Sequence, residues 1–225
     1  MLFPSRCPIC DKVRPIGSAK ICNYCEKTLS TVTTPFCMKC GKALEDETRE
    51  YCRDCSTVNH EYNQGRAVFL YPCIRKSVYR LKYKNRKEYA EYLGWKMAQV
   101  CGKTIKEWNP DALVPVPLHE KRMQKRGYNQ AELLAKELSK YIHVPVNTTL
   151  VKRERNTKPQ KALNVVERQN NLKNAFKIEQ NNVKLKTIVI IDDIYTTGST
   201  IDAIAKELKA IGVQRVYYVA LVIGR

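Results

Sequence analysis

One short run is more informative about the fold than any other part of the chain: Ile190-Ile191-Asp192-Asp193-Ile194-Tyr195-Thr196-Thr197-Gly198-Ser199-Thr200. A short apolar segment at 187–191 ends in two acids, and a turn of small hydroxyl residues with one glycine follows them. A helical pattern then begins at about Ser199. The run therefore predicts a strand, a loop and a helix, in that order.

The loop of this unit has the composition of a phosphate-binding turn. Backbone N–H groups at a helix N-terminus lack intrahelical partners and lie at the positive end of the helix dipole, which favours a bound anion. Gly198 lets the backbone approach a ligand closely, and the loop offers hydroxyls from Thr196, Thr197, Ser199 and Thr200. The paired acids suit sugar hydroxyls, or a metal ion held through water. The alternative is an ordinary turn with a Ser199 cap and solvated acids.

From about residue 62 onward, strand and helix patterns alternate. Near-continuous apolar runs at 187–191 and 216–223 are typical of strands that are buried on both faces, and a helix over 199–211 connects them. Earlier segments predict strands over 65–71 and 112–117, and helices over 74–84, 89–101 and 129–141. This alternation predicts an α/β fold with a doubly wound parallel sheet. Its ligand site should lie at the carboxyl ends of the strands, where the 192–200 loop falls.

The first 60 residues form a small cysteine-rich module, which we expect to precede a domain over residues 61–225. Eight of the ten cysteines form C-x2-C pairs whose first members are fifteen residues apart: Cys7/Cys10, Cys22/Cys25, Cys37/Cys40 and Cys52/Cys55. A C-x2-C turn places two thiolates on one side of a knuckle, and two knuckles complete a tetrahedron around zinc. The module therefore predicts two structural zinc sites.

The pairing of the knuckles stays open at this point. Sequential pairing gives two stacked zinc ribbons and interleaved pairing gives a cross-brace; the short loops favour the sequential arrangement. Disulfides are disfavoured in a reducing compartment, a thioredoxin-like site needs only one such pair, and iron is the less favoured metal. Cys73 and Cys101 lie outside the repeat and are expected to be small buried hydrophobes. His60, His119 and His143 belong to no recognisable ligand set.

The formal charge of +18 lies almost entirely outside the cysteine module. Residues 1–60 contribute only +2 and residues 61–225 contribute +16. Such a charge predicts attraction to polyanions, although a soluble domain of a lysine-rich proteome has the same property. No apolar run approaches the roughly 20 residues that span a bilayer, and the N-terminus lacks a signal-peptide pattern. We therefore expect a cytoplasmic protein.

Basic residues cluster in three segments, at 75–87, 121–126 and 152–177. The first contains no acid, and Tyr79 and Tyr83 lie among its cations. This combination suits single-stranded nucleic acid, because cations follow the phosphates and rings stack on the bases. The alternative is a set of solvated helix faces whose tyrosines pack into the core. The candidate contacts for a pyrophosphate or a DNA phosphate are Lys82, Lys84, Arg122, Arg126, Arg155 and Arg168.

Several segments together resemble the ComF family. The 190–200 run resembles the 5-phosphoribosyl-1-pyrophosphate (PRPP) loop of type I phosphoribosyltransferases, in which apolar and acidic residues precede T-T-G-x-T. The resemblance covers essentially the whole chain, including the four cysteine pairs. Its further motifs are Val114-Pro115-Val116-Pro117-Leu118, Arg122, Arg126-Gly127-Tyr128-Asn129-Gln130, Arg153, Arg155, Gln160, Leu163, Arg168, Asn171 and Phe176.

The ComF resemblance implies a double zinc ribbon joined to a type I phosphoribosyltransferase-like domain, with a role in natural transformation. Family members are thought to bind single-stranded DNA and to work with a membrane-associated helicase and a recombination mediator. The first hypothesis is therefore an accessory protein of DNA uptake that binds single-stranded DNA in the basic domain. In this hypothesis the phosphate loop is available to a DNA phosphate or terminus.

The resemblance also implies a second hypothesis, a PRPP-dependent phosphoribosyltransferase that acts on a nucleobase or a related acceptor. By analogy, Asp192 and Asp193 contact the ribose hydroxyls, residues 196–200 bind the 5′-phosphate, and Arg122 or Arg126 approaches the pyrophosphate. The segment around 153–168 would close over the site, and magnesium would bridge pyrophosphate and ribose. The chain ends directly after its last strand without an obvious base-stacking hood, so the acceptor site is not evident. A third hypothesis is a scaffold whose ribbons dock a protein partner.

Overall fold

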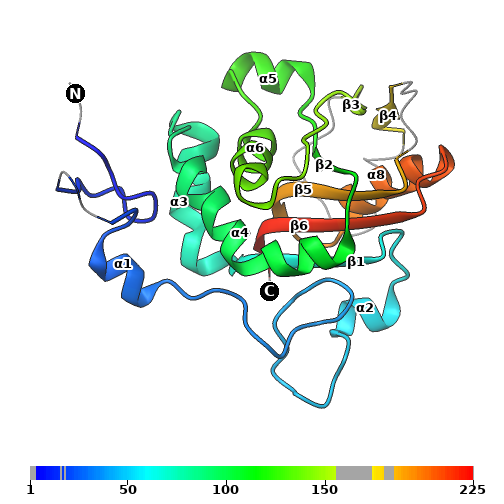
Figure 1. The fold of residues 1–225 in the computed structure, drawn as a ribbon, viewed down its shortest axis with the longest axis horizontal. Coiled ribbons are helices and arrows are strands. Elements are labelled where there is room, and N and C mark those ends of the chain that lie inside the picture. Colours follow the sequence, from blue (N-terminus) through cyan, green and yellow to red (C-terminus); the bar gives the residue numbers. More distant parts are fainter. Residues whose placement is uncertain (1–3, 16, 18, 156–173, 180–184, 225) are drawn as a thin grey trace.

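A four-stranded parallel sheet forms the centre of the molecule. The structure is a computed structural model that describes residues 4–15, 17, 19–155, 174–179 and 185–224 (Figure 1). The strand order is β1-β6-β5-β2, and every neighbouring pair is parallel. The bounds of these strands are β1 Gln64–Leu70, β2 Ala112–Pro115, β5 Thr187–Tyr195 and β6 Arg215–Ile223. The predicted parallel α/β sheet is therefore confirmed.

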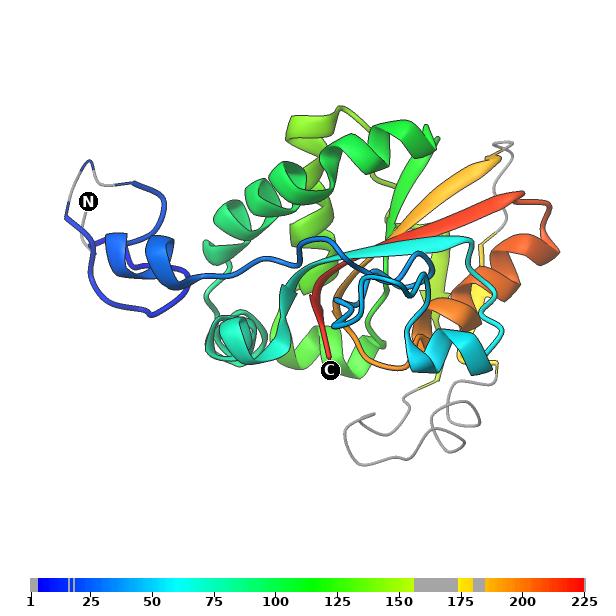
Figure 2. The same cartoon turned by 90° about the horizontal axis from the view of Figure 1, so that it is seen from below.

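Helices cover both faces of the sheet, as a doubly wound arrangement requires (Figure 2). Three helices pack on one face, namely α3 (Tyr71–Tyr83), α4 (Tyr89–Trp108) and α6 (Gln130–Ile142). Helix α8 (Ser199–Ala210) packs on the other, beside the short antiparallel pair of β3 (Val151–Arg153) and β4 (Phe176–Ile178). The other helices of the described residues are α1 (Asn23–Thr28), α2 (Arg53–Thr57) and α5 (Glu120–Arg126).

The alternation of side chains along β6 explains why both faces are apolar. Successive strand residues point to opposite faces of a sheet. Val216 and Tyr218 belong to the hydrophobic cluster on the α8 face, whereas Val219 and Leu221 belong to the cluster under α3, α4 and α6. Residues of β6 therefore contribute to both hydrophobic clusters, one on each face of the sheet. Among the described residues, no helix is long and apolar enough to cross a membrane.

The two cysteine ribbons pack on different parts of this core. Cys7 and Cys25 belong to the cluster under α3 and α4, while Cys37 and Cys40 belong to the cluster on the α8 face. An extended segment joins the ribbons and runs along the edge of β1, where the Val32 N–H donates to the Val68 carbonyl oxygen at 2.8 Å. The expectation of stacked ribbons is therefore wrong: the ribbons lie apart in both views (Figures 1 and 2).

The two cysteines outside the repeat differ from each other. Cys101 is buried in α4, as expected for a small hydrophobe. Cys73 is exposed, and here the expectation is wrong. It lies in the first turn of α3, whose buried side is formed by Ile74, Val78 and Leu81 with Ser77. The Cys73 side chain falls outside that 3.6-residue stripe and therefore faces solvent.

Candidate phosphate pocket, basic groove and metal centres

A cavity of about 440 Å³ opens at the carboxyl ends of the sheet. This is the edge at which ligands of parallel α/β sheets bind, because the loops that follow the strands converge there. Thr196 in the β5–α8 loop and Thr200 in the first turn of α8 also line the cavity. Its lining includes residues from the ends of all four strands, namely Tyr71 after β1, Val116 and Pro117 after β2, Asp192, Asp193 and Ile194 in β5, and Gly224 after β6.

The two acids lie at the base of this cavity in unlike surroundings. Both are buried, with 8% of Asp192 and 4% of Asp193 exposed. Burial raises the pKa of Asp192 well above its ordinary value, and the neighbouring Asp193 charge raises it further. Burial acts on Asp193 in the same direction, but the Lys82 ammonium, 2.5 Å away, outweighs it and lowers the Asp193 pKa. The pKa values of the two neighbouring carboxyls are therefore shifted in opposite directions.

The loop between β5 and α8, which the sequence predicts to bind phosphate, follows a strand and leads into a helix, in the predicted order. Gly198 is the N-cap residue of α8 and adopts φ +80°, a left-handed conformation that favours glycine. The Thr197 and Ser199 hydroxyls lie 2.9 Å apart. The start of this twelve-residue helix lies beside the cavity, with Thr196 and Thr200 in its wall. The arrangement can accept an oxyanion.

Three arginines also line the cavity. Arg122 and Arg126 come from α5, and Arg126 also donates to the Gln130 side chain. Arg153 comes from β3; burial, followed by the nearby Arg122 charge, lowers its pKa to about 10. Arg153 was not among the six candidate anion contacts, although it lies in the basic segment 152–177 and among the ComF motifs. Together with Lys82, these side chains make the cavity a cationic pocket with two acids at its base.

A longer groove of about 870 Å³ continues from the pocket along α3. The two share Tyr71, Lys82, Tyr83 and Ile194, so they form one continuous depression. Among the described lining residues of the groove, Asp11 is the one acid, and it lies 3.4 Å from the Arg80 guanidinium and 3.8 Å from that of Arg86. Its basic lining residues are Arg75, Lys76, Arg80, Lys82, Lys84 and Arg86.

Two tyrosines of α3 stand exposed in this groove. Tyr79 is 52% exposed and Tyr83 is 61% exposed, and their ring centroids lie 5.2 Å apart. The Arg126 guanidinium lies 5.4 Å from the centre of the Tyr83 ring. The alternative in which these tyrosines pack into the core is therefore wrong. Both rings remain available for stacking.

The structure brings together some of the predicted anion contacts and separates others. Lys82, Arg122 and Arg126 line the pocket, whereas Lys84 lines only the α3 groove. Arg155 is exposed and lines neither depression. Arg168, together with most of the 153–168 segment that was expected to close over the site, lies outside the described residues.

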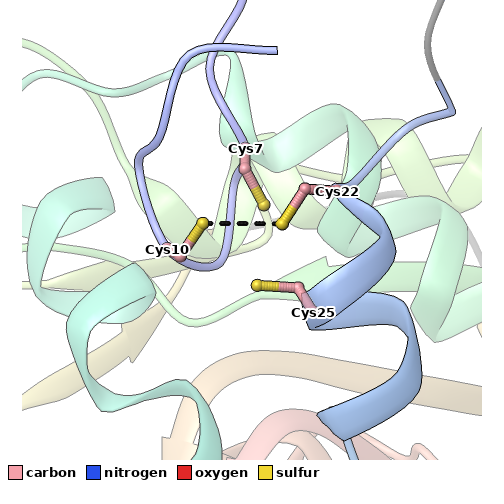
Figure 3. A group of neighbouring side chains, drawn as sticks. All are labelled: Cys7, Cys10, Cys22 and Cys25. Carbon is pink, nitrogen blue, oxygen red and sulfur yellow. Dashed lines mark hydrogen bonds between the residues drawn. The ribbon is translucent and has the colours of Figure 1, made fainter.

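The eight repeated cysteines form two tetra-cysteine groups with sequential pairing. The Sγ atoms within each group lie within 4.8 Å of one another, and those of the first group point toward a common centre (Figure 3). Cys10 and Cys22 have their sulfurs 3.7 Å apart, as have Cys40 and Cys52. Tetrahedral zinc with Zn–S bonds of about 2.3 Å requires sulfurs about 3.8 Å apart. The two groups therefore suit two zinc sites.

The histidines take structural positions outside both cysteine groups, in agreement with the sequence. His119 accepts a hydrogen bond from the Lys121 N–H at the start of α5, and His143 ends α6 in a left-handed conformation. His60 lies with Nδ1 2.8 Å from Asp202 Oδ2 in the first turn of α8. This last contact, between the end of the cysteine module and the phosphate-loop helix, was not foreseen.

Comparison with known families agrees with this geometry. Residues 1–56 match the double zinc ribbon domain, and residues 96–225 match the phosphoribosyl transferase domain, a match to more than half of the chain. The chain belongs to the phosphoribosyl transferase domain family. The combination with a double zinc ribbon confirms the resemblance to the ComF family.

Several curated proteins are similar to part of the chain. Competence protein F of Haemophilus influenzae is 40% identical over 109 residues, which are 48% of each chain. DNA utilization protein YhgH of Escherichia coli K12 is 37% identical over 140 residues, or 61% of each chain. Competence protein ComFC of Bacillus subtilis is 28% identical over 64% of this chain and 57% of its own length. The chain thus spans about half to three-fifths of these relatives.

Two solved phosphoribosyltransferases show a partial structural likeness. The purine phosphoribosyltransferase of Pyrococcus horikoshii Ot3 has 19% identity and a TM-score of 0.37, over 57% of this chain and 74% of its own. A hypoxanthine phosphoribosyltransferase of Staphylococcus aureus has 16% identity and a TM-score of 0.36, over 61% and 64%. The fold class follows from the parallel sheet and the family match.

Proposed function

We propose that this protein binds single-stranded DNA in the α3 groove and the adjoining pocket, as an accessory protein of DNA uptake in natural transformation. The observation that carries the proposal is the pair of exposed tyrosines, Tyr79 and Tyr83, within a groove whose described lining holds six basic side chains and one acid. Cations that follow a sugar-phosphate backbone and rings that stack on bases are what single-strand binding requires.

The names of the relatives support the DNA-uptake part of this proposal. Two of them are called competence proteins and one a DNA utilization protein. A single strand entering the cell passes between a helicase at the membrane and a recombination mediator, and a cytoplasmic protein that holds the strand would serve between them. These partners and this location are parts of the proposal, as is the use of the phosphate loop for a DNA phosphate or terminus.

Salt dependence tests whether the pocket arginines contact the DNA backbone. Each phosphate contact with a single strand lowers the slope of log K against log salt by about 0.7. We therefore expect Arg122→Ala and Arg126→Ala to weaken binding of a labelled oligonucleotide and to flatten this slope, each by about one contact. Anisotropy titrations at several salt concentrations measure both quantities. An affinity and a slope that stay at wild-type values in both variants would place the DNA elsewhere.

Substitution of Tyr83 tests base stacking separately from charge. A stacked base is worth about 1–3 kcal/mol, so Tyr83→Ala should weaken oligonucleotide binding by about tenfold or more, while Tyr83→Phe should retain most of the affinity. Tyr141 on α6 is 39% exposed and lines neither the pocket nor the groove, so Tyr141→Ala is the matched control. Equal losses in Tyr83→Ala and Tyr141→Ala would argue against a stacking platform.

A second candidate function, a PRPP-dependent transferase, is supported by the two acids beside the phosphate loop. The carboxylates of Asp192 and Asp193 are suitable contacts for ribose hydroxyls or for the oxygen shell of Mg²⁺. The Lys82 ammonium is paired with the Asp193 carboxylate, so contact of Asp193 with ribose or Mg²⁺ would require this ion pair to break. The test is base-dependent pyrophosphate release that disappears in Asp192→Asn. A screen of all common bases without turnover would remove this candidate.

A further inference from the structure

The second cysteine ribbon packs directly against the central sheet. The N–H of Gly65 in β1 donates to the Lys39 carbonyl oxygen at 2.8 Å, and the Tyr218 hydroxyl of β6 donates to the Cys40 carbonyl oxygen at 2.6 Å. A Cβ on Gly41 would lie 2.8 Å from the Gly65 carbonyl oxygen, so the two backbones are in contact. Four thiolates around a metal fix the shape of this knuckle. That shape therefore constrains β1 and β6.

Three buried tyrosines continue from the knuckle toward the phosphate loop. The rings of Tyr195 and Tyr218 stack with centroids 4.7 Å apart and planes within 4° of parallel. Tyr62 lies edge-on to both rings, and its hydroxyl is 2.7 Å from that of Tyr195. Lys39, between two metal ligands, donates to the Tyr62 carbonyl oxygen at 2.5 Å. None of the three tyrosines is more than 4% exposed, so they are densely packed and a displacement of one ring strains the others.

This cluster meets the phosphate loop at Gly198. A Cβ on Gly198 would lie 2.7 Å from the Tyr195 hydroxyl and 2.9 Å from the His60 ring. His60 Nδ1 lies 2.8 Å from Asp202 Oδ2, and the Glu61 N–H donates to Asp202 Oδ1 at 2.8 Å. Asp202 belongs to the first turn of α8. The short segment of His60 and Glu61, which follows α2, therefore contacts both the loop at Gly198 and the start of its helix.

The first ribbon makes a different set of contacts. Asp11 pairs with Arg80 and accepts a hydrogen bond from the Tyr89 hydroxyl, while Lys20 pairs with Glu91 at 3.3 Å. All these partners lie in α3 and α4 or just between them. In the part of the chain that the structure describes, the hydrogen bonds and ion pairs of the first ribbon do not reach β5 or α8. A substitution in the first ribbon is therefore a suitable control for the equivalent substitution in the second ribbon.

We propose that the second zinc ribbon positions the phosphate loop, and that Tyr62 and Tyr195 transmit the constraint. Metal bound by the second cysteine group holds the knuckle, the knuckle holds the tyrosines, and the tyrosines hold Gly198 and the first turn of α8. Tyr62 is a positioning residue, because it lines no part of the pocket. The consequence for ligand affinity rests on the proposed phosphate pocket, whereas the mechanical coupling does not.

Two matched cysteine variants test the role of the metal. Cys22 and Cys52 are the N-cap residues of α1 and α2 and occupy equivalent places in the two groups. Zinc analysis of the full-length protein should give two ions per chain in the wild type and one in each of Cys22→Ser and Cys52→Ser. Hydrogen exchange of the amides at 196–203 should be faster only in Cys52→Ser. Equal exchange in both variants would overturn the proposal.

Tyr62→Phe tests the coupling with both metals in place. It removes one hydroxyl and leaves the buried Tyr195 hydroxyl without this partner, so exchange in the loop should rise on the order of tenfold. Tyr89→Phe removes the corresponding hydroxyl that contacts the first ribbon and should leave loop exchange unchanged. If Tyr62→Phe also leaves loop exchange at the wild-type rate, the tyrosines do not transmit the constraint and the proposal is wrong.

Binding of inorganic phosphate separates this inference from the proposed pocket. If the wild type binds phosphate, Tyr62→Phe should weaken that binding severalfold, and Tyr89→Phe should not. If the wild type binds no phosphate while the loop still exchanges faster in Tyr62→Phe and Cys52→Ser, the coupling stands and the phosphate pocket fails. If phosphate binds equally well to the wild type and Tyr62→Phe and loop exchange is unchanged, the pocket stands and the coupling fails.

Discussion

At the scale of single residues, the neighbouring carboxyls of Asp192 and Asp193 behave in opposite ways. Burial and the adjacent charge raise the pKa of Asp192, while the Lys82 ammonium outweighs burial and lowers the pKa of Asp193. Two carboxyls that interact this closely lose their protons in two separate steps that belong to the pair. The ion pair between Lys82 and Asp193 reduces the net negative charge at the base of the pocket.

This difference predicts opposite effects of two amide substitutions on stability. A raised pKa means that the unfolded chain ionises Asp192 before the folded protein does, so stability is lost as the pH rises from about 4. Asp192→Asn keeps the Oδ1 that accepts the Asp193 N–H. We expect it to melt at a higher temperature than the wild type near pH 8, with the difference shrinking toward about pH 4.

For Asp193 the sign is reversed. Its lowered pKa contributes stability above about pH 4, and this contribution is lost as the pH falls through the folded-state pKa. Asp193→Asn removes the ion pair with Lys82 and should therefore melt below the wild type near pH 8. Thermal melts of both variants between about pH 3 and pH 8 measure the two trends. The assignment of charges would be wrong if both variants shifted in the same direction near pH 8.

At the scale of elements, the close packing of β1 against the Tyr218 ring of β6 requires the glycine at position 65. A Cβ on Gly65 would lie 1.9 Å from Cε1 of Tyr218, so alanine can enter only if the tyrosine ring moves. Forcing atoms into a packed core costs about 1–3 kcal/mol. We expect Gly65→Ala to lower the free energy of unfolding by that amount in urea titrations.

Gly102 in α4 provides the matched control for this substitution. The nearest atom to a Cβ there is Ile142 Cγ2 at 3.5 Å, an ordinary contact distance. Alanine in a helix interior is favoured over glycine by about 0.5–1 kcal/mol, so Gly102→Ala should stabilise the protein. If Gly65→Ala also stabilised it, the packing of Tyr218 against β1 would differ from that described.

The ends of elements were harder to predict from the sequence than their existence. We expected α4 to end at Cys101, but Ile105 and Trp108 continue its buried stripe past Gly102. We expected β5 to end before its acids, yet its pairing with β6 continues to Tyr195 and Ile223. In the sequence, Gly102 suggests the end of a helix, and the two acids suggest the end of a strand. In the structure, the buried stripe extends helix α4, and pairing with β6 extends strand β5. Helix α5 and strands β3 and β4 were not predicted as elements.

At the scale of the whole molecule, local motifs predicted several residues that line the candidate site, and tertiary packing added others. The phosphate loop and the cysteine knuckles are contiguous in sequence, so their chemistry is visible there. The three-tyrosine cluster of Tyr62, Tyr195 and Tyr218 joins residues from distant parts of the chain, and no pattern predicts it. The groove likewise needs the first ribbon, because Asp11 forms part of its wall.

The shared lining of pocket and groove links the proposed DNA binding to the proposed phosphate site. Lys82 and Tyr83 belong to both depressions. We therefore expect a strand along α3 and a ligand in the 196–200 loop to compete for the same side chains. The most direct test is an anisotropy titration of a labelled single-stranded oligonucleotide, with and without magnesium-PRPP, at fixed moderate salt. We expect the oligonucleotide to bind and PRPP to displace it. An oligonucleotide that does not bind would contradict the central claim and leave the basic groove as ordinary surface.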